Sequence, residues 1–363
     1  MKIEIEAGAD FKFLKDRVSL GVTYYQNKIQ GAVLAVTVAG STGYTNQWKN
    51  AADLSNKGFE ADLNINVIKK KDFNLNVYGN IGLNRNMVDN LNGAAPIFLA
   101  GFTGTSSRAV EGQPLGVLWG GKWMRDEKNN LILDANGFPQ PAAQEGVLGN
   151  PNPNYRGSIG VNGNYKGISF NLLVETCQGN QMWAGTYGVL NNFGINPETA
   201  NEFTVDATKA ATLKDYNGKS VADYAANPAK YGNGMVMDNG DGTYTCRGNI
   251  KDYGNGDVWL NQNWYTGLGG GFGSVSEQFI KDASWVRIRE LSVNYAIPTN
   301  IAKALHVPGG ITLGFTGRNL ALWTNFAGVD PETNLTGPSN GRGLEYFNNP
   351  GTKSFMFNIK FNL

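Results

Sequence analysis

The sequence predicts an all-β fold in which antiparallel strands form a transmembrane β-barrel. Three observations support this prediction: apolar and polar residues alternate in nearly every readable segment, short turns alternate with long loops, and the composition is rich in glycine. Glycine accounts for 48 of the 363 residues, nearly twice its usual share, while charged residues make up only 17%. Such a composition favours strands and turns over helices.

Alternation with a period of two residues identifies the strands, because successive side chains of a strand point to opposite faces. In the segment 59–67, apolar residues from Phe59 to Val67 share one face, and polar residues from Glu60 to Asn66 share the other. The same pattern occurs at 18–24, 73–83, 168–174, 311–315 and 355–361. We therefore expect two-faced strands with a polar face turned toward a hydrated interior.

The connections between these strands alternate in length. Short polar turns are expected at 14–17, 69–72 and 165–167, and long loops at about 31–55, 89–114, 179–282 and 323–350. Outer-membrane barrels have this plan, with short turns in the periplasm and long loops outside the cell. We expect about ten to twelve strands. The short turns at 69–72 and 165–167 must lie on the same side of the membrane, so the number of strands in 84–155 must be even. Segment 129–138 forms either a further strand or an excursion of a loop.

Composition excludes several classes of function. A net charge of +1 gives no broad basic surface for nucleic acid. The longest apolar run, 31–40, is about half the length of a membrane-spanning helix. The N-terminus opens directly into a strand pattern without a secretory signal peptide. No linker divides the chain, so residues 1–363 are expected to form one structural unit.

Neither metal nor cofactor binding is predicted. The two cysteines, Cys177 and Cys246, lack CxxC spacing, and the only histidine, His306, is expected at the surface. The cysteines either form a disulfide or stay as free thiols. The acidic segments 238–245 and 252–257 do not have calcium-loop spacing, because Gly240 stands where the second ligand would be. Tight turns are expected there.

No group of residues in the sequence has the pattern of a catalytic site. The glycine-rich segment 267–273 follows no strand and opens no helix, so a flexible loop is expected rather than a phosphate site. A glycosidase needs two carboxyl groups held together, and nothing in the sequence brings together two of the following: Glu175, Asp252, Asp257 and Asp330. We expect a protein that is not an enzyme.

Arg287 and Arg289 lie on the polar face of a predicted strand beside Trp285. They are expected to form a charge ladder that faces the lumen. Structural support is the commoner role for such a pair.

Several segments together resemble the C-terminal half of the barrel of SusC/RagA-type TonB-linked outer-membrane transporters. They are DASWVRIRELSVNYAIP at 282–298, ITLGFTGRNLALWTNFAGVDPETN at 311–334, SFMFNIKFNL at 354–363, SNKGFEADLNI at 55–65, PLGVLWGGKW at 114–123, NGFP at 136–139 and LGNPNPNYRGSIGVNGNYKGISF at 148–170. Their order and spacing fit this family across nearly the whole chain, with 180–280 the weakest part. The family's complete barrel has about 22 strands, preceded by a signal peptide and a plug domain. By this resemblance the chain is a fragment without plug or signal peptide. For Arg287 and Arg289, the resemblance implies an alternative role, a contact with the plug in a complete homologue.

The resemblance implies a location in the outer membrane of a Gram-negative bacterium and a role in importing oligosaccharides or peptides. The implied partners are a SusD-like surface lipoprotein, TonB through the missing plug, outer-membrane lipid, and the barrel-assembly machinery. That machinery would recognise the last strand, with Phe355, Phe357, Ile359 and Phe361 on one face. Two alternatives stay open: a non-transporting barrel remnant or surface adhesin, and, with less support, a secreted soluble β-enzyme.

Aromatic residues in the long loops are the candidate contacts for a glycan or peptide ligand or for a protein partner, because aromatic planes stack on sugar rings and anchor interfaces. The candidates are Trp183, Tyr187, Trp259, Trp264 and Tyr265.

Overall fold

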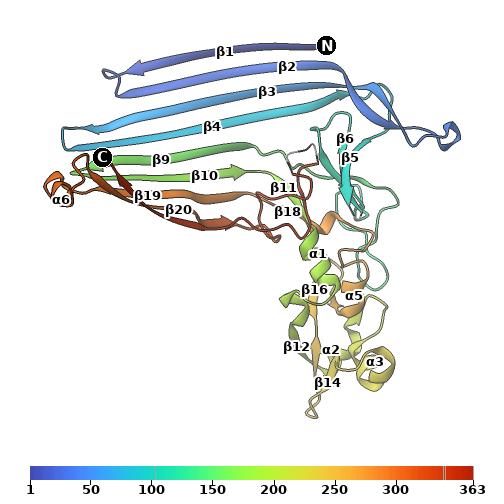
Figure 1. The fold of residues 1–363 in the computed structure, drawn as a ribbon. Helices are drawn as coiled ribbons and strands as arrows, with labels where there is room; N and C mark the ends of the chain where they lie inside the picture. The colour runs from blue at the N-terminus through green and yellow to red at the C-terminus, as the bar shows by residue number, and fades with distance from the viewer. Residues whose placement is uncertain (103, 338, 340, 363) are drawn as a thin grey trace.

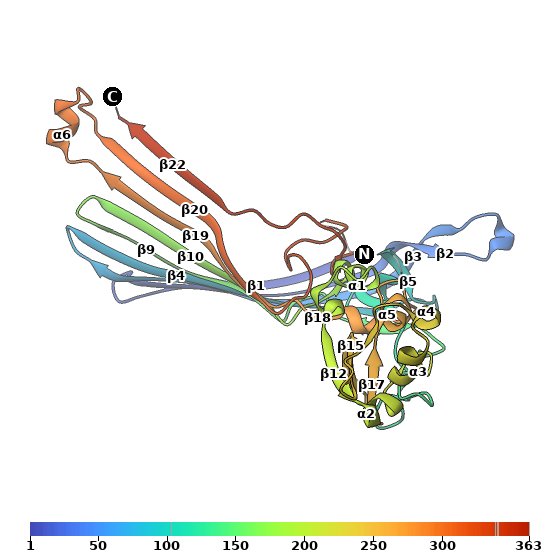
Figure 2. The same cartoon turned by 90° about the horizontal axis from the view of Figure 1, so that it is seen from below.

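A curved nine-stranded antiparallel sheet forms most of the chain in the computed structural model, which describes residues 1–363 except 103, 338, 340 and 363 (Figure 1). Strand order across the sheet is β1-β2-β3-β4-β9-β10-β19-β20-β22. The strands are Lys2–Phe13 (β1), Val18–Thr37 (β2), Asn46–Lys69 (β3), Phe73–Asn90 (β4), Tyr155–Tyr165 (β9), Ile168–Gln178 (β10), Trp285–Ala296 (β19), Ile311–Thr324 (β20) and Ser354–Phe361 (β22). The predicted antiparallel β architecture is confirmed, and Figure 2 shows the curvature of the sheet.

The main sheet has nine strands within the described residues, fewer than the ten to twelve expected, because 91–154 adds none to it. β4 pairs directly with β9, so no strand of the main sheet lies between them, and their short turns fall on the same side, as the even-number requirement demands. The intervening residues form a separate four-stranded sheet of Ile97–Phe102 (β5), Thr105–Ala109 (β6), Val117–Gly120 (β7) and Gly146–Gly149 (β8). Segment 129–138 is an excursion held by isolated bridges such as Leu133 to Pro139.

Short turns lie at one end of the main sheet and long connections at the other (Figure 1), as the sequence predicted. The connection between β19 and β20 also lies at the turn end and carries the short helix Thr299–Ala304 (α6). The prediction of a loop over 31–55 is wrong, because β2 and β3 continue as a paired hairpin as far as Thr37 and Asn46. Burial explains the extension, because Ala51 and Ala52 pack in an apolar cluster with Val88.

The two faces of the sheet differ in chemistry, and the register makes this clear. One face carries continuous apolar rows, such as Leu20, Leu63, Gly79 and Ile159 on four neighbouring strands. The opposite face carries amide rows, such as Asn66, Asn76, Asn162 and Asn171. On the last strand, Phe357 is 81% exposed. An exposed apolar face opposite a polar one is typical of the wall of a membrane barrel.

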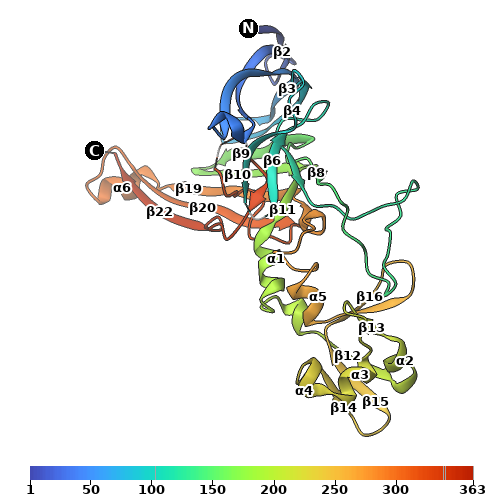
Figure 3. The same cartoon turned by 90° about the vertical axis from the view of Figure 1, so that its right-hand side faces the viewer.

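Residues 179–282 form a separate unit that projects from the loop end of the sheet (Figure 3). Its strands are Gln181–Ala184 (β11), Glu202–Asp206 (β12), Lys214–Asp215 (β13), Val236–Asp238 (β14), Thr243–Arg247 (β15), Asn249–Asp252 (β16), Asp257–Leu260 (β17) and Ile280–Asp282 (β18). Its helices are Gly185–Asn192 (α1), Ala207–Thr212 (α2), Val221–Ala226 (α3), Pro228–Tyr231 (α4) and Gln262–Thr266 (α5). We call this part the loop unit. Leu344–Glu345 (β21) pairs with β11 from the later loop. No helix among the described residues has the length and apolarity needed to cross a membrane.

Candidate functional site

A network of ion pairs, buried at Arg287 and Asp330 and partly exposed at Arg289, Glu175 and Glu332, lies at the loop end of β10 and β19. Arg287 on β19 donates two hydrogen bonds to the carboxylate of Asp330, at 2.8 and 3.0 Å, and only 5% of each side chain is exposed. Its Nε lies 2.7 Å from Glu332. Arg289 joins the same Glu332 to Glu175 on β10, with 2.6 Å to each. Each cation therefore has two carboxylates, which compensates much of the cost of removing these charges from water.

The network fixes the segment that follows β20 against the sheet. Asp330 also accepts hydrogen bonds from the backbone N–H groups of Glu332 and Gly351, so the carboxylate holds both ends of the segment between them. The guanidinium carbons of Arg287 and Arg289 lie 5.8 and 5.7 Å from the centre of the Trp285 ring. Structural support, the commoner of the roles expected for these arginines, thus describes the contacts that they make in this chain.

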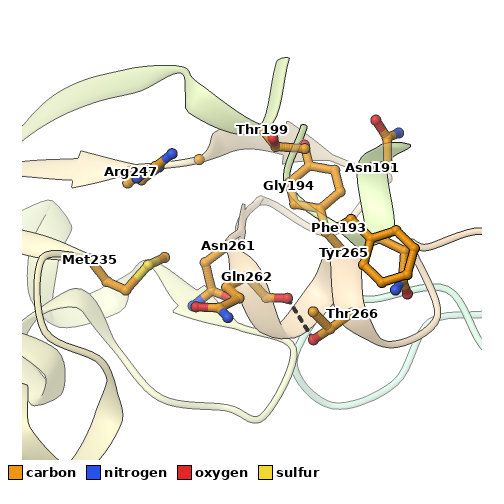
Figure 4. Close-up of a pocket in the computed structure, with 12 residues that line it drawn as sticks. Asn191, Phe193, Gly194, Thr199, Met235, Arg247, Asn261, Gln262, Tyr265 and Thr266 are labelled. Carbon is orange, nitrogen blue, oxygen red and sulfur yellow. Dashed lines mark hydrogen bonds between the residues drawn. The ribbon is translucent and has the colours of Figure 1, made fainter. Parts of the chain in front are cut away.

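A polar pocket of about 270 Å³ opens in the loop unit between α1 and α5 (Figure 4). Figure 4 shows Arg247 and Met235 on one side, Phe193 and Tyr265 on the other, and Gln262 between them. The remaining lining residues are Asn191, Asn192, Gly194, Thr199, Gly248, Asn261 and Thr266. The side chains of Arg247 and Gln262 have no hydrogen-bond partner among the described residues. Their N–H groups are therefore available to a ligand in the pocket.

The wall of this pocket next to α1 is held rigid by Glu198. This carboxylate accepts hydrogen bonds of 2.7 Å from the hydroxyl of Tyr187 and from the amide of Asn191. Burial, together with the bond to Glu198, raises the pKa of Tyr187 to about 12, so its hydroxyl stays protonated. The Oδ1 atom of Asn191 is buried and has no partner in the described part of the chain. Amides, a guanidinium and aromatic rings suit a ligand rich in hydrogen-bonding groups, such as a sugar or a peptide.

The predicted aromatic contacts fall into two groups. Trp183, Trp259 and Trp264 are at most 3% exposed and form parts of three apolar clusters, so in this structure their faces pack against protein. Tyr265 lines the pocket, and Tyr187 lies beside it on α1. Ligand contact by these residues stays a prediction. Of the five, Tyr265 lines the pocket, although it is only 8% exposed and belongs to the same apolar cluster as Trp264. Sequence reasoning missed Arg247 and Gln262, because neither belongs to a motif.

The four carboxylates considered for catalysis have separate structural roles. Glu175 and Asp330 bind different arginines of the ion-pair network, Arg289 and Arg287. Asp257 forms a 2.6 Å ion pair with Lys209. Asp252 accepts the N–H of Gly254 in a tight turn.

The acidic glycine segments are tight turns, as predicted. In 238–245, Asp238 accepts the N–H of Gly240 and Asp241 accepts that of Thr243. The prediction for 267–273 is wrong in one respect: this segment is tightly packed rather than loose. A Cβ at Gly271 would collide with the backbone of Gly188, whose carbonyl accepts the Gly271 N–H at 2.8 Å. His306 is exposed, as predicted.

Both cysteines are buried free thiols, which settles the alternative that the sequence left open. Burial raises the pKa of Cys246 to about 12, so almost no thiolate forms near neutral pH. We expect Cys246 in the folded protein to resist iodoacetamide at pH 8 and to react after denaturation. Mass spectrometry of the tryptic peptide measures this. Rapid alkylation of the native protein would contradict the burial of this thiol.

Comparisons with known proteins agree with this architecture. No protein-family model matches the chain. Two TonB-dependent receptors of Formosa agariphila, P3 and P26, are 20% and 22% identical to it over 99% and 98% of its length. The chain spans about a third of the length of these curated relatives, 34% in both cases. Among solved structures, a chain of the RagAB peptide transporter matches with a TM-score of 0.65 and 17% identity, covering 99% of this chain and 35% of that one.

A second structure, the RagAB peptide importer in the open-open state, gives a TM-score of 0.61 at 16% identity and covers 100% of this chain and 34% of that one. The resemblance to TonB-linked transporters of the SusC/RagA type, and the barrel fold that it implied, are confirmed by these matches. The relatives are receptors and transporters rather than enzymes, in agreement with the expectation of a non-enzymatic protein.

Proposed function

We propose that this chain, which resembles one part of a SusC/RagA-type TonB-dependent receptor, forms barrel wall in an outer-membrane importer of oligosaccharides or peptides. The nine-stranded sheet with one apolar and one amide-rich face is the observation that carries this proposal. A face rich in amides provides a hydrated surface that hydrogen-bonds to a passing solute. The similarity to TonB-dependent receptors over nearly the whole chain supports the energy source.

The loop unit is the part that we assign to ligand and partner contact. Its pocket offers Arg247 and Gln262 as free donors and Tyr265 as an aromatic wall. The partner that we propose is a SusD-like surface lipoprotein, because the solved relatives are RagAB transporters. TonB would act through a plug domain of the complete protein, and the barrel-assembly machinery would bind the exposed aromatic face of β22.

Uptake by a deletion strain tests the proposal. The gene for the complete protein should restore growth on an oligosaccharide or peptide source that the deletion strain cannot use. Complementation with a gene that carries R247A and Q262A should restore less uptake, because the free donors of the pocket are lost. Heat-modifiable migration of the protein in outer-membrane extracts controls for folding.

The alternatives predict other outcomes of the same experiment. A non-transporting barrel remnant or adhesin would appear in the outer-membrane extract but leave uptake unchanged on every tested source. A secreted soluble protein would be found outside the membrane fraction. Either result would overturn the import proposal.

A further inference from the structure

The outward face of β2, β3 and β4 changes from apolar to charged within one row of residues. Tyr24, Phe59 and Leu83 lie opposite one another in the last apolar row. Gln26, Lys57 and Arg85 form the next row of the same face, two residues further along each strand toward the loop end. Tyr24 and Phe59 are 46% and 40% exposed, so aromatic rings mark the boundary of the apolar belt.

Three cations gather directly beyond this boundary. Lys28 follows Gln26 on the same face of β2, so Lys28, Lys57 and Arg85 lie on three neighbouring strands and are all exposed. On other strands of the sheet, the outward-facing residues at the loop end are uncharged. Examples are Tyr155 on β9, Gln178 on β10 and Trp323 on β20. The cluster of Lys28, Lys57 and Arg85, which we call the rim cations, is therefore local and not a ring.

The charges of the rim cations are not neutralised by protein. Arg85 donates only to neutral oxygens, namely the carbonyls of Asn84, Pro153 and Asn154 and the side chain of Asn154, at 2.9 to 3.2 Å. Neither lysine forms an ion pair within the described residues. Lys57 and Arg85 lie directly opposite each other across β3 and β4. Like charges in such a pair are destabilising, with Cβ atoms about 5 Å apart, and an anion between them would remove that cost.

A groove of about 540 Å³ runs beside the rim cations. Its lining also includes Asp53 and Asp89, which lie four residues further from the apolar belt than Lys57 and Arg85 on the same strands. One oxygen of Asp53 accepts the Gly31 N–H, and one of Asp89 accepts the Ser55 hydroxyl, each at 2.8 Å. The cations thus border the apolar belt, and the carboxylates border the solvent.

We propose that the rim cations bind the phosphate of a glycolipid in the outer leaflet, with its acyl chains against the apolar rows that end at Phe59 and Leu83. This inference rests on the outer-membrane location proposed above. A lipid phosphate lies at the edge of the hydrocarbon layer, where the face changes character. Guanidinium and ammonium groups are the side chains that hold phosphate most strongly. The outer carboxylates would accept hydroxyl groups of the lipid's sugar.

Native mass spectrometry of the complete receptor in neutral detergent tests the site. Titration with monophosphorylated lipid A should give a bound species whose dissociation constant rises at least tenfold in the K28Q/K57Q/R85Q variant. The same lipid without its phosphate should bind wild type and variant equally weakly. The matched control K214Q/K230Q/K251Q removes the same charge from exposed lysines of the loop unit and should bind like wild type.

Two further measurements keep the outcome decisive. R85Q also removes the bonds to Pro153 and Asn154, so K28Q/K57Q, which leaves Arg85 in place, should still weaken binding at least threefold. Equal affinity of the wild type and both rim variants would overturn the site while leaving the import proposal intact. Binding of inorganic phosphate with the same affinity and the same loss would overturn the lipid assignment in favour of a soluble anion. Failure to recover the receptor from outer membranes would instead count against the import proposal.

Discussion

Replacement of Arg287 by alanine is expected to lower the free energy of unfolding of the complete protein by about 3–5 kcal/mol. The guanidinium is almost fully buried and holds Asp330 by two hydrogen bonds. Its removal leaves that carboxylate buried without a cation, and it releases the segment between Glu332 and Gly351 that Asp330 fixes. Denaturant unfolding of the receptor in detergent, followed by tryptophan fluorescence, measures the loss.

Arg318→Ala is the matched control for this prediction. Arg318 also forms an ion pair from the main sheet, with Glu290 at 3.0 Å, but its side chain is 54% exposed. Exposed pairs contribute within about 1 kcal/mol, so R318A should unfold close to wild type. The double variant R287A/D330A should be less destabilised than the sum of the two single variants, because no unpaired carboxylate is left at 330. Equal effects of R287A and R318A would show that burial does not decide the strength of this network.

The strands of the main sheet could be predicted because their signal is local. In 59–67, each side chain reveals its face by its own polarity, and the structure places Phe59 opposite Tyr24 and Leu83 on the apolar face. Where a stretch has no polar alternation, this signal fails. Segment 31–40 reads as one apolar run. Its first part, up to Thr37, belongs to β2 and packs against Val88 and Ile97, which lie more than 40 residues away in the sequence.

The sites depend on contacts that no local pattern contains. Arg287 could be placed on a polar face, but its partner Asp330 lies 43 residues further along the chain. The loop aromatics were expected to face ligand because the loop unit was not expected to have a core of its own. One available signal was missed: Ser220 and Asp223 form a capping box at the start of α3, and Val221 and Tyr224 of this helix are buried in that core. Short capped helices of this kind indicate a folded unit rather than an open loop.

Replacement of Trp259 by alanine is expected to unfold much of the loop unit while the main sheet stays intact. Trp259 is fully buried, packs edge-to-face on Tyr224 with 4.9 Å between ring centres, and donates a 2.9 Å hydrogen bond to the carbonyl of Arg247. Truncation of a buried tryptophan costs about 3–5 kcal/mol, which is a large share of the stability of a unit of this size. Limited trypsin digestion of the receptor in detergent should show faster cleavage within 207–251 and unchanged heat-modifiable migration.

Trp48→Ala gives the control, because Trp48 is 73% exposed on the hairpin of β2 and β3 and its loss should leave digestion within the loop unit unchanged. W259A also links stability to the proposed function. Trp259 holds the carbonyl of Arg247, and Arg247 lines the pocket, so W259A should reduce uptake as the combined R247A and Q262A substitutions are expected to do. Normal uptake and normal protease resistance of W259A would contradict this prediction. They would show that neither the fold of the loop unit nor the position of Arg247 depends on the Trp259 side chain.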